Sequence, residues 1–263
     1  MKRLISLLAI IVLAAGSARA APPIALTSQL ATYDLTLLKV RGHAVTGATG
    51  RLQFDVTDTC HAYAVTQRLT LLIRKEDGSL VRTVSNYDTW ESHDGRHFSF
   101  LLRNTQDGKT KVKSQGTAEL GHDGGMVTYS EPKRHFVKLP AHTLFPMAQT
   151  VMLLQAAESG RKFLTTPLFD GTSTNGAEDS FVAVLGLSGM KHSTFPQLSK
   201  VPSVLVDISF FPRVREDNKP DFRSQMQYYT DGVARSVRLD FGNFVMRGRL
   251  THLKIPPPTC QKR

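Results

Sequence analysis

The chain has 263 residues and a formal net charge of +11 at pH 7, from 33 Lys and Arg against 22 Asp and Glu. That length is enough to bury a real core in one large all-β domain or in two small domains. The basic excess favours anionic lipid headgroups, envelope polysaccharides or acidic partners, although charge dispersed for solubility is the simpler interpretation. The chain's two cysteines, Cys60 and Cys260, are too far apart for a Cys-x-x-Cys redox pair.

The first twenty residues have the pattern of a secretory signal peptide. Basic residues at positions 2 and 3 precede an apolar run over 4–15, and Ala18 and Ala20 occupy the two positions that favour cleavage. Because a bilayer span takes about 20 apolar residues, this run is too short to be a retained anchor. We therefore predict a cleaved signal at 1–20 and a periplasmic protein that does not span the membrane. Nucleic acid is not an expected partner there, and the two cysteines are expected to pair.

From Gln29 onward, apolar and polar side chains alternate, as in Ala31-Thr32-Tyr33-Asp34-Leu35, which is typical of strands with one buried face. Six Asp-Gly pairs separate such runs and indicate hairpin turns. The pattern predicts a single all-β domain over 21–263, with about thirteen mostly antiparallel strands. A sheet of that size is expected to curl into a barrel or spiral, or to split into two packed sheets, because its edges must be managed. The predicted strands cover 29–41, 48–57, 62–75, 80–92, 96–105, 109–120, 125–131, 162–169, 178–187, 203–212, 222–230, 234–241 and 243–255.

One helix is predicted, over residues 145–159, with Pro146 in its first turn and Gly160 after its end. Met147, Val151 and Leu154 share a face at i, i+4 and i+7, and this face needs an apolar partner. The concave side of a curled sheet would supply it. These three residues either pack in the core or line a ligand pocket, since methionine adapts to irregular apolar shapes.

Three local features carry weaker expectations. The segment 170–179, rich in Gly, Ser, Thr and Asn, is expected to be a surface connection that is either passive or moves over a cavity. Trp90, the only tryptophan, is interpreted as a packing residue at the rim of the sheet. His93 and His97 flank an Asp-Gly turn, where a surface metal site is one interpretation and solvated turn residues the simpler one. No metal or other cofactor is predicted.

No catalytic motif is discernible. HExxH and phosphate-cradling glycine loops are absent, and the nucleophile-elbow pattern fails at Met190, where a glycine is required. Glu91, Asp94 and Glu178 are the acidic candidates for an envelope glycan or peptidoglycan hydrolase. We predict a protein that is not an enzyme, with this hydrolase and a polyanion-binding protein as the alternatives.

A polar cluster follows Cys60. Because side chains alternate between the two faces of a strand, Tyr63 and Gln67 share one face and Arg68 lies on the other. We predict that Tyr63, Gln67 and Arg68 form a buried hydrogen-bonded network beside a Cys60–Cys260 disulfide. The network would lie where the first and last strands meet, with Cys60 as the point to which the proline-rich tail returns.

Several short stretches together resemble a known family. They are Ala31-Thr32-Tyr33-Asp34-Leu35, Asp58-Thr59-Cys60, Trp90-Glu91-Ser92, Leu139-Pro140-Ala141-His142-Thr143-Leu144-Phe145-Pro146 and Pro257-Pro258-Thr259-Cys260. Their order and spacing resemble the alphaproteobacterial periplasmic cell-envelope-integrity proteins of the EipB type. The resemblance implies a many-stranded β-spiral, similar in shape to the half-barrels of periplasmic lipoprotein carriers, with one helix across it and an internal disulfide.

The resemblance also implies a role in envelope integrity and stress resistance rather than a catalysed reaction. Paired apolar residues such as Leu37-Leu38, Leu71-Leu72 and Phe210-Phe211 put apolar side chains on both faces of some strands. The expected partner is therefore either a lipid or lipoprotein-like ligand in a pocket, or another periplasmic envelope protein that docks on the sheet.

Overall fold

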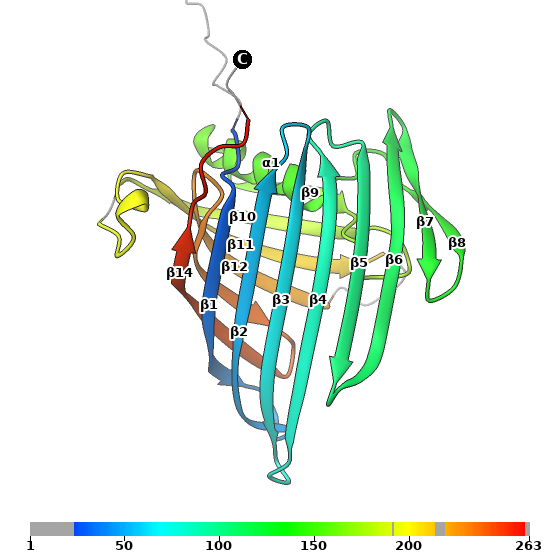
Figure 1. The fold of residues 1–263 in the computed structure, drawn as a ribbon, viewed down its shortest axis with the longest axis vertical. Helices are drawn as coiled ribbons and strands as arrows, with labels where there is room; N and C mark the ends of the chain where they lie inside the picture. Colours follow the sequence, from blue (N-terminus) through cyan, green and yellow to red (C-terminus); the bar gives the residue numbers. More distant parts are fainter. Residues whose placement is uncertain (1–23, 191, 214–218, 261–263) are drawn as a thin grey trace, which may run out of the picture.

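The computed structural model describes residues 24–190, 192–213 and 219–260, and the signal peptide predicted at 1–20 lies outside them. In these residues, fourteen strands form one antiparallel sheet that curls on itself, with α1 (Pro146–Glu158) inside the curl (Figure 1). The predicted fold, a curled many-stranded sheet with a helix on its concave face, is confirmed. The strands are β1 (Gln29–Val40), β2 (Val45–Asp58), β3 (Ala62–Lys75), β4 (Leu80–Ser92), β5 (His97–Gln106), β6 (Lys109–Gly121), β7 (Gly124–Glu131), β8 (His135–Leu139), β9 (Phe163–Leu168), β10 (Glu178–Ser188), β11 (Ser203–Pro212), β12 (Phe222–Tyr229), β13 (Ala234–Asp240) and β14 (Phe244–Lys254).

Strands that follow one another along the chain are neighbours in the sheet except β8 and β9, and the first and last strands also pair. β1 lies between β2 and β14, with Tyr33 opposite Leu250 and Leu35 opposite Gly248. The two halves of the chain therefore join at the middle of the sheet, and β8 and β9 are its two ends. A short 3-10 helix, η1 (Pro196–Leu198), precedes β11.

Most Asp-Gly pairs lie in tight turns, as predicted. Gly78, between β3 and β4, and Gly108, between β5 and β6, have φ angles of 81° and 79°. This left-handed backbone is easily adopted by glycine, and so the pairs end one strand and start the next. Asp170-Gly171 is different, because it opens a long connection between β9 and β10.

The helix fills the space between the two halves of the sheet at one end (Figure 1). Pro146 occupies its first turn, as predicted. Its buried residues pack with Val182 and Val206 of one half and with Val56 and Val65 of the other. Burying the helix between both halves removes apolar surface from water on both sides of it. Within the described residues, no helix is long and apolar enough to cross a membrane.

Residues 169–177, which we call the bridging loop, connect the two ends of the sheet without strand pairing. The Tyr129 hydroxyl of β7 donates to the Ser173 main-chain oxygen over 2.8 Å and accepts from the Gly176 N–H over 3.2 Å. Phe169 is fully buried among the aromatic rings of Phe98, Phe100, Phe145 and Tyr129. The expected surface connection is therefore exposed only in part, at Thr172 and Asn175, because the loop also closes the gap between β8 and β9.

His135 of β8 also contacts the bridging loop. Its two ring nitrogens lie 2.8 Å from the Lys133 main-chain oxygen and 3.0 Å from that of Thr174. Both partners are acceptors, so the doubly protonated imidazolium satisfies both contacts. These two main-chain carbonyls raise the pKa of His135 above its ordinary value. The ring stacks on Tyr129, with centroids 4.3 Å apart.

Candidate functional site

The disulfide joins Cys60, in the turn between β2 and β3, to Cys260, beyond β14. The Cα atoms are 5.4 Å apart, although 200 positions separate the residues in sequence. The Thr259 hydroxyl donates to the Asp58 main-chain oxygen over 2.6 Å, which holds the tail against the end of β2. We call these four residues the clasp. The predicted pairing is confirmed, and it links β2 to the tail of β14 across β1.

The Asp58 carboxylate connects the clasp to the neighbouring strands. It accepts the Cys60 main-chain N–H over 2.8 Å and lies 3.1 Å from Nε2 of His93, in the turn after β4. The His93 ring packs on Tyr63 of β3, with centroids 4.5 Å apart. His93 is thus held by protein groups. No group of three metal-ligating side chains occurs among the residues that the structure describes.

The predicted network of Tyr63, Gln67 and Arg68 does not form. Tyr63 is buried in the core cluster around α1, and Gln67 is half-buried on the same face of β3. Arg68 is exposed on the opposite face, as the alternation of a strand requires. The prediction of a buried hydrogen-bonded cluster is therefore wrong, and the contacts of the clasp run through Asp58 and His93 instead.

Glu91 anchors the start of the helix. Its side chain is 1% exposed, and its two carboxylate oxygens accept the main-chain N–H groups of Met147 and Ala148 over 2.8 and 2.7 Å. A helix N-terminus presents free N–H groups and a positive dipole end, so a carboxylate is a suitable partner. Burial raises the pKa of Glu91 to about 7, and the two N–H groups limit that rise. Tyr63 lies opposite Glu91 in the sheet, so the helix anchor adjoins the clasp.

The other acidic candidates lie elsewhere. Asp94 is in the turn after β4, where the Ser92 hydroxyl and the Arg96 N–H lower its pKa. Glu178 begins β10, where burial and the nearby charges of Asp170 and Asp221 raise its pKa to about 7. Glu91 and Glu178 stand on different halves of the sheet, and both oxygens of Glu91 are occupied by the helix. The three side chains are therefore not gathered at one site.

The predicted helix face is part of the core. Met147 and Leu154 are buried, and Val151 is half-buried beside them. Their neighbours are valines of β10 and β11, so their burial supports the core-packing interpretation over the pocket-lining one.

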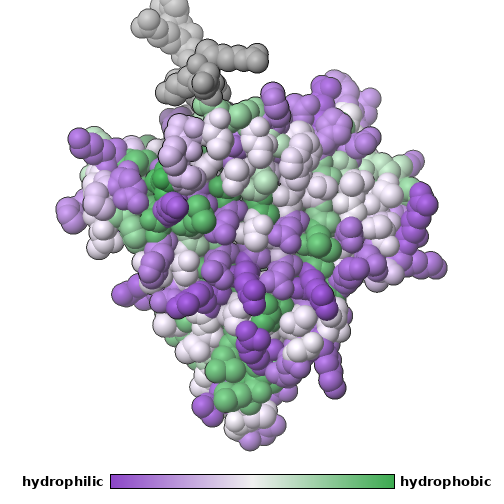
Figure 2. Space-filling model, in the orientation of Figure 1, coloured by the Kyte–Doolittle hydropathy of each residue, from purple (hydrophilic) through white to green (hydrophobic). Residues whose placement is uncertain are grey.

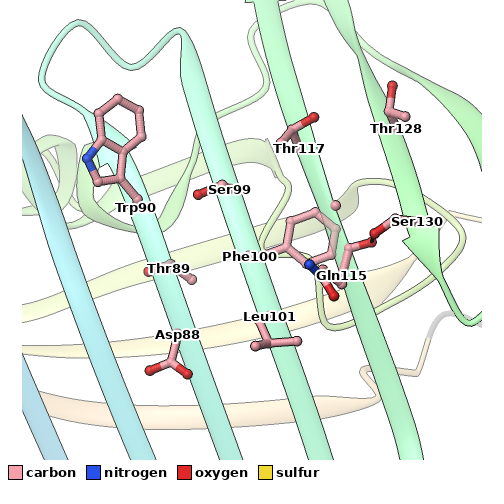
Figure 3. Close-up of a pocket in the computed structure, with 11 residues that line it drawn as sticks. Asp88, Thr89, Trp90, Ser99, Phe100, Leu101, Gln115, Thr117, Thr128 and Ser130 are labelled. Carbon is pink, nitrogen blue, oxygen red and sulfur yellow. Dashed lines mark hydrogen bonds between the residues drawn. The ribbon is translucent and has the colours of Figure 1, made fainter.

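A hollow lies on the outer face of β4–β7, on the side of the sheet away from α1 (Figure 3). Its volume is about 460 Å³, within the range of small-molecule sites. Trp90 stands at one end of the hollow and is 41% exposed, so its ring is only partly packed against the sheet. Figure 2 shows the surrounding outer face as mostly polar, with apolar residues in small separate patches. We call this feature the outer hollow. It is lined by Asp88, Thr89, Trp90, Ser99, Phe100, Leu101, Gln115, Gly116, Thr117, Thr128 and Ser130.

Sequence reasoning missed the outer hollow and the role of Glu91. A signal for the hollow was present, since Asp88 and Trp90 alternate with inward-facing residues of β4. For Glu91, the signal was its position on the same face of β4 as Tyr87 and beside the apolar Phe98 of β5, where a carboxylate needs a polar partner. In both cases, however, the partners come from strands or a helix whose packing only the structure shows.

The fold and the clasp define a class of protein: a single curled antiparallel sheet that encloses a helix and is fastened by a disulfide between its second strand and its C-terminal tail. Comparison with known proteins makes this class specific. The family described as EipB-like matches residues 20–257, and the chain belongs to this family.

Two relatives illustrate the likeness. The cell envelope integrity protein EipB of Brucella abortus (strain 2308) is 29% identical over 251 residues, covering 92% of this chain and 88% of that protein. The crystal structure of a beta-barrel-like protein of the domain of unknown function DUF1849, also from Brucella abortus, superposes with a TM-score of 0.82 at 27% identity. That alignment covers 89% of this chain and all of the other.

Proposed function

We propose that this chain is a periplasmic, non-catalytic protein that maintains the integrity of the cell envelope. The observation that carries the proposal is its similarity, over 92% of its length, to a protein named for cell envelope integrity. The signal-peptide pattern at 1–20 and the disulfide support the location, because disulfides persist in oxidising compartments outside the cytoplasm.

Three features support a role as a rigid scaffold. The clasp fastens the tail to β2, Glu91 fixes the start of α1, and the bridging loop joins the two ends of the sheet. The acidic groups that a hydrolase would need are separated, and Glu91 serves the fold itself. Glycoside hydrolysis normally uses two carboxylates on either side of the bond that is cleaved. A scaffold that holds a ligand or partner fits these groups better than a hydrolase does.

The ligand that we propose for the interior is lipid-like. Beyond the helix, the inward face carries large apolar residues that are only half-buried, among them Leu69, Ile73, Phe222 and Phe241. Acyl chains would cover this surface. Docking of another envelope protein is the second candidate, favoured by the exposed rings of Phe163 and Phe181, which stack 5.7 Å apart on β9 and β10.

Native mass spectrometry of gently purified protein distinguishes these candidates. The lipid-like ligand predicts a co-purifying mass that is displaced by fatty acids and lost in Ile73→Asp, with the exposed Leu72→Asp as the matched control. A ligand-free mass, with no displacement of an apolar dye by acyl chains, would leave docking as the proposal.

The envelope role itself is tested by deleting the gene in its native host. The deletion strain should become sensitive to detergent, and the wild-type gene should restore survival. The variants Asp94→Asn and Glu178→Gln should restore it equally, since neither carboxylate is assigned to chemistry. Turnover of cell-wall glycan that disappears in either variant would contradict the non-catalytic proposal.

A further inference from the structure

The outer hollow spans four neighbouring strands of the sheet, β4 to β7. Figure 3 shows Asp88 and Trp90 on β4, with Ser99, Thr117 and Thr128 on the strands beside it. Strands lie about 4.8 Å apart and rise about 3.4 Å per residue, so the hollow extends roughly 14 Å across the strands and roughly 7 Å along them. An elongated ligand lying across the strands would fit these dimensions.

The lining combines apolar and polar side chains and is almost uncharged. Asp88 is the only charged residue among the lining residues, although the chain carries a net charge of +11. At the margin, Lys113 is paired with Glu131 over 2.8 Å. A phosphate, a lipid headgroup or a nucleic acid would find no cation in the lining to bind, because recognition of such anions relies on Arg and Lys.

Five polar side chains of the hollow are free to bind, while the Ser130 hydroxyl donates to the Gln115 main-chain oxygen over 3.2 Å. In the part of the chain that the structure describes, no protein hydrogen bond engages the side chains of Trp90, Ser99, Gln115, Thr117 and Thr128. Hydroxyl and amide groups can each donate and accept, and the indole N–H donates. Such a set matches a ligand that presents many hydroxyl groups.

Asp88 adds an acceptor to these groups, and Trp90 adds an apolar surface. One oxygen of Asp88 accepts the Thr66 hydroxyl over 2.8 Å, which orients the carboxylate and leaves the second oxygen to accept from a ligand. The exposed indole of Trp90 offers a flat apolar surface beside a polar N–H. A sugar ring has the same combination, since its C–H groups form apolar faces and its hydroxyls project from the edges.

From these observations we propose that the outer hollow binds an uncharged glycan chain, with a sugar ring stacked on Trp90 and its hydroxyls bonded to Asp88, Ser99, Gln115 and Thr117. The site binds without cleaving, because it has one carboxylate where glycoside hydrolysis uses two. The inference rests on the proposed periplasmic location, where envelope glycans surround the protein.

The single tryptophan makes the test direct, because the protein gives one indole N–H resonance, from Trp90. Mature protein labelled with ¹⁵N is titrated with short oligosaccharides of chitin, cellulose and β-1,2-glucan, and separately with sodium phosphate and with dihexanoylphosphatidylcholine below its micelle concentration. We expect at least one oligosaccharide to shift the indole resonance saturably, and neither phosphate nor the phospholipid to do so.

Calorimetry with that oligosaccharide assigns the site. Trp90→Ala should weaken binding about tenfold or more, the order expected when an aromatic contact is lost. Trp90→Phe keeps an aromatic ring and should bind with intermediate affinity. This variant tests the aromatic contact even if the alanine variant does not fold. Thr117→Val with Thr128→Val removes two hydroxyls at nearly constant shape and should also weaken binding. Phe163→Ala, which truncates an aromatic side chain that is 63% exposed on β9, is the matched control and should bind like the wild type.

Three results would overturn the proposal: no indole shift with any oligosaccharide on folded protein, binding that survives all the hollow variants, or a larger shift with phosphate or phospholipid. These outcomes are separate from the envelope role. If the chain restores survival to a deletion strain but binds no oligosaccharide, only the proposal of glycan binding at the outer hollow is rejected. If the chain binds an oligosaccharide but does not restore survival, only the proposed role in envelope integrity is rejected.

Discussion

Removing the disulfide should lower the stability of the protein substantially while leaving the sheet intact. In the double variant Cys60→Ser with Cys260→Ser, the pairing of β1 with β14 and the bond from Thr259 to Asp58 remain possible. We therefore expect the native far-UV circular dichroism to persist. What changes is the unfolded chain, which loses a cross-link between residues 200 positions apart.

The magnitude follows from that separation. In the chain-entropy model, closing a loop of 200 residues removes about 5 kcal/mol of unfolded-state entropy at 25 °C. Removing a native disulfide from a small secreted domain typically costs about 2 to 5 kcal/mol. We expect the double variant to lose roughly 3 to 5 kcal/mol in free energy of unfolding.

Urea unfolding, followed by circular dichroism and by the fluorescence of Trp90, measures this loss. The slope m should rise in the variant, because its unfolded chain exposes more surface without the cross-link. Dithiothreitol should lower the stability of the wild type to that of the variant and leave the variant unchanged. A loss below about 1 kcal/mol with an unchanged m would refute the reasoning, because the cross-link would then not restrict the unfolded chain.

Other predictions concern the helix anchor and the bridging loop. Glu91→Gln should lower the free energy of unfolding by about 1 to 3 kcal/mol, since the amide can accept at only one of its two ends, whereas the exposed Glu119→Gln should change it little. The pKa of Glu91 is about 7 in the folded chain and ordinarily 4.5, so its protonation favours folding. The stabilisation from protonated Glu91 is complete below about pH 4.5 and is lost as the pH rises through 7. A wild-type stability that does not fall relative to Glu91→Gln over this range would contradict the assignment. His135 also has a raised pKa, so its support for the bridging loop should be complete below its ordinary pKa and weaken as the pH rises through the raised value. An NMR titration giving an ordinary or lower pKa would reject this. Phe169→Ala should cost about 3 to 5 kcal/mol and speed amide exchange in the bridging loop, because a fully buried ring is removed. Unchanged exchange there would show that the ring does not hold the loop.

The strands were largely predictable because their signals are local. Alternation of apolar residues and the Asp-Gly turns locate the strands to within a few residues of their observed ends, from β1 to β14. The strand that was missed, β8, has five residues between Pro132 and Pro140, too short a run for a clear period. The helix was predictable for a similar reason, since Pro146 and Gly160 mark its two ends.

Other features depended on packing between distant residues. The disulfide was predictable from the expected compartment, but the role of Asp58 beside it was not. Arg68 is close in sequence to Cys60 and was correctly placed on the face opposite Tyr63 and Gln67, but that face is exposed, so the predicted buried network does not form. The bridging loop looked like a surface connection because it is rich in Gly, Ser and Thr, yet Phe169 at its start is buried by rings from other strands.

The candidate site was the least predictable part. The sequence offers Glu91 only as an acidic candidate for a hydrolase, and the position of α1 is needed to show that its carboxylate binds a helix N-terminus. The outer hollow brings together residues of four strands, and each strand taken alone shows only ordinary exposed Ser, Thr and Gln. Trp90 was noticed because it is the only tryptophan, and its exposure became evident only in the folded sheet.

The most direct test of the central claim is the survival on sublethal detergent of a strain that lacks this gene, carrying either the full chain or a form without residues 1–20. We predict that the full chain restores survival to the wild-type level and that the form retained in the cytoplasm does not, although both are expressed. Equal survival with both forms, or no loss of survival on deletion, would contradict a periplasmic role in envelope integrity.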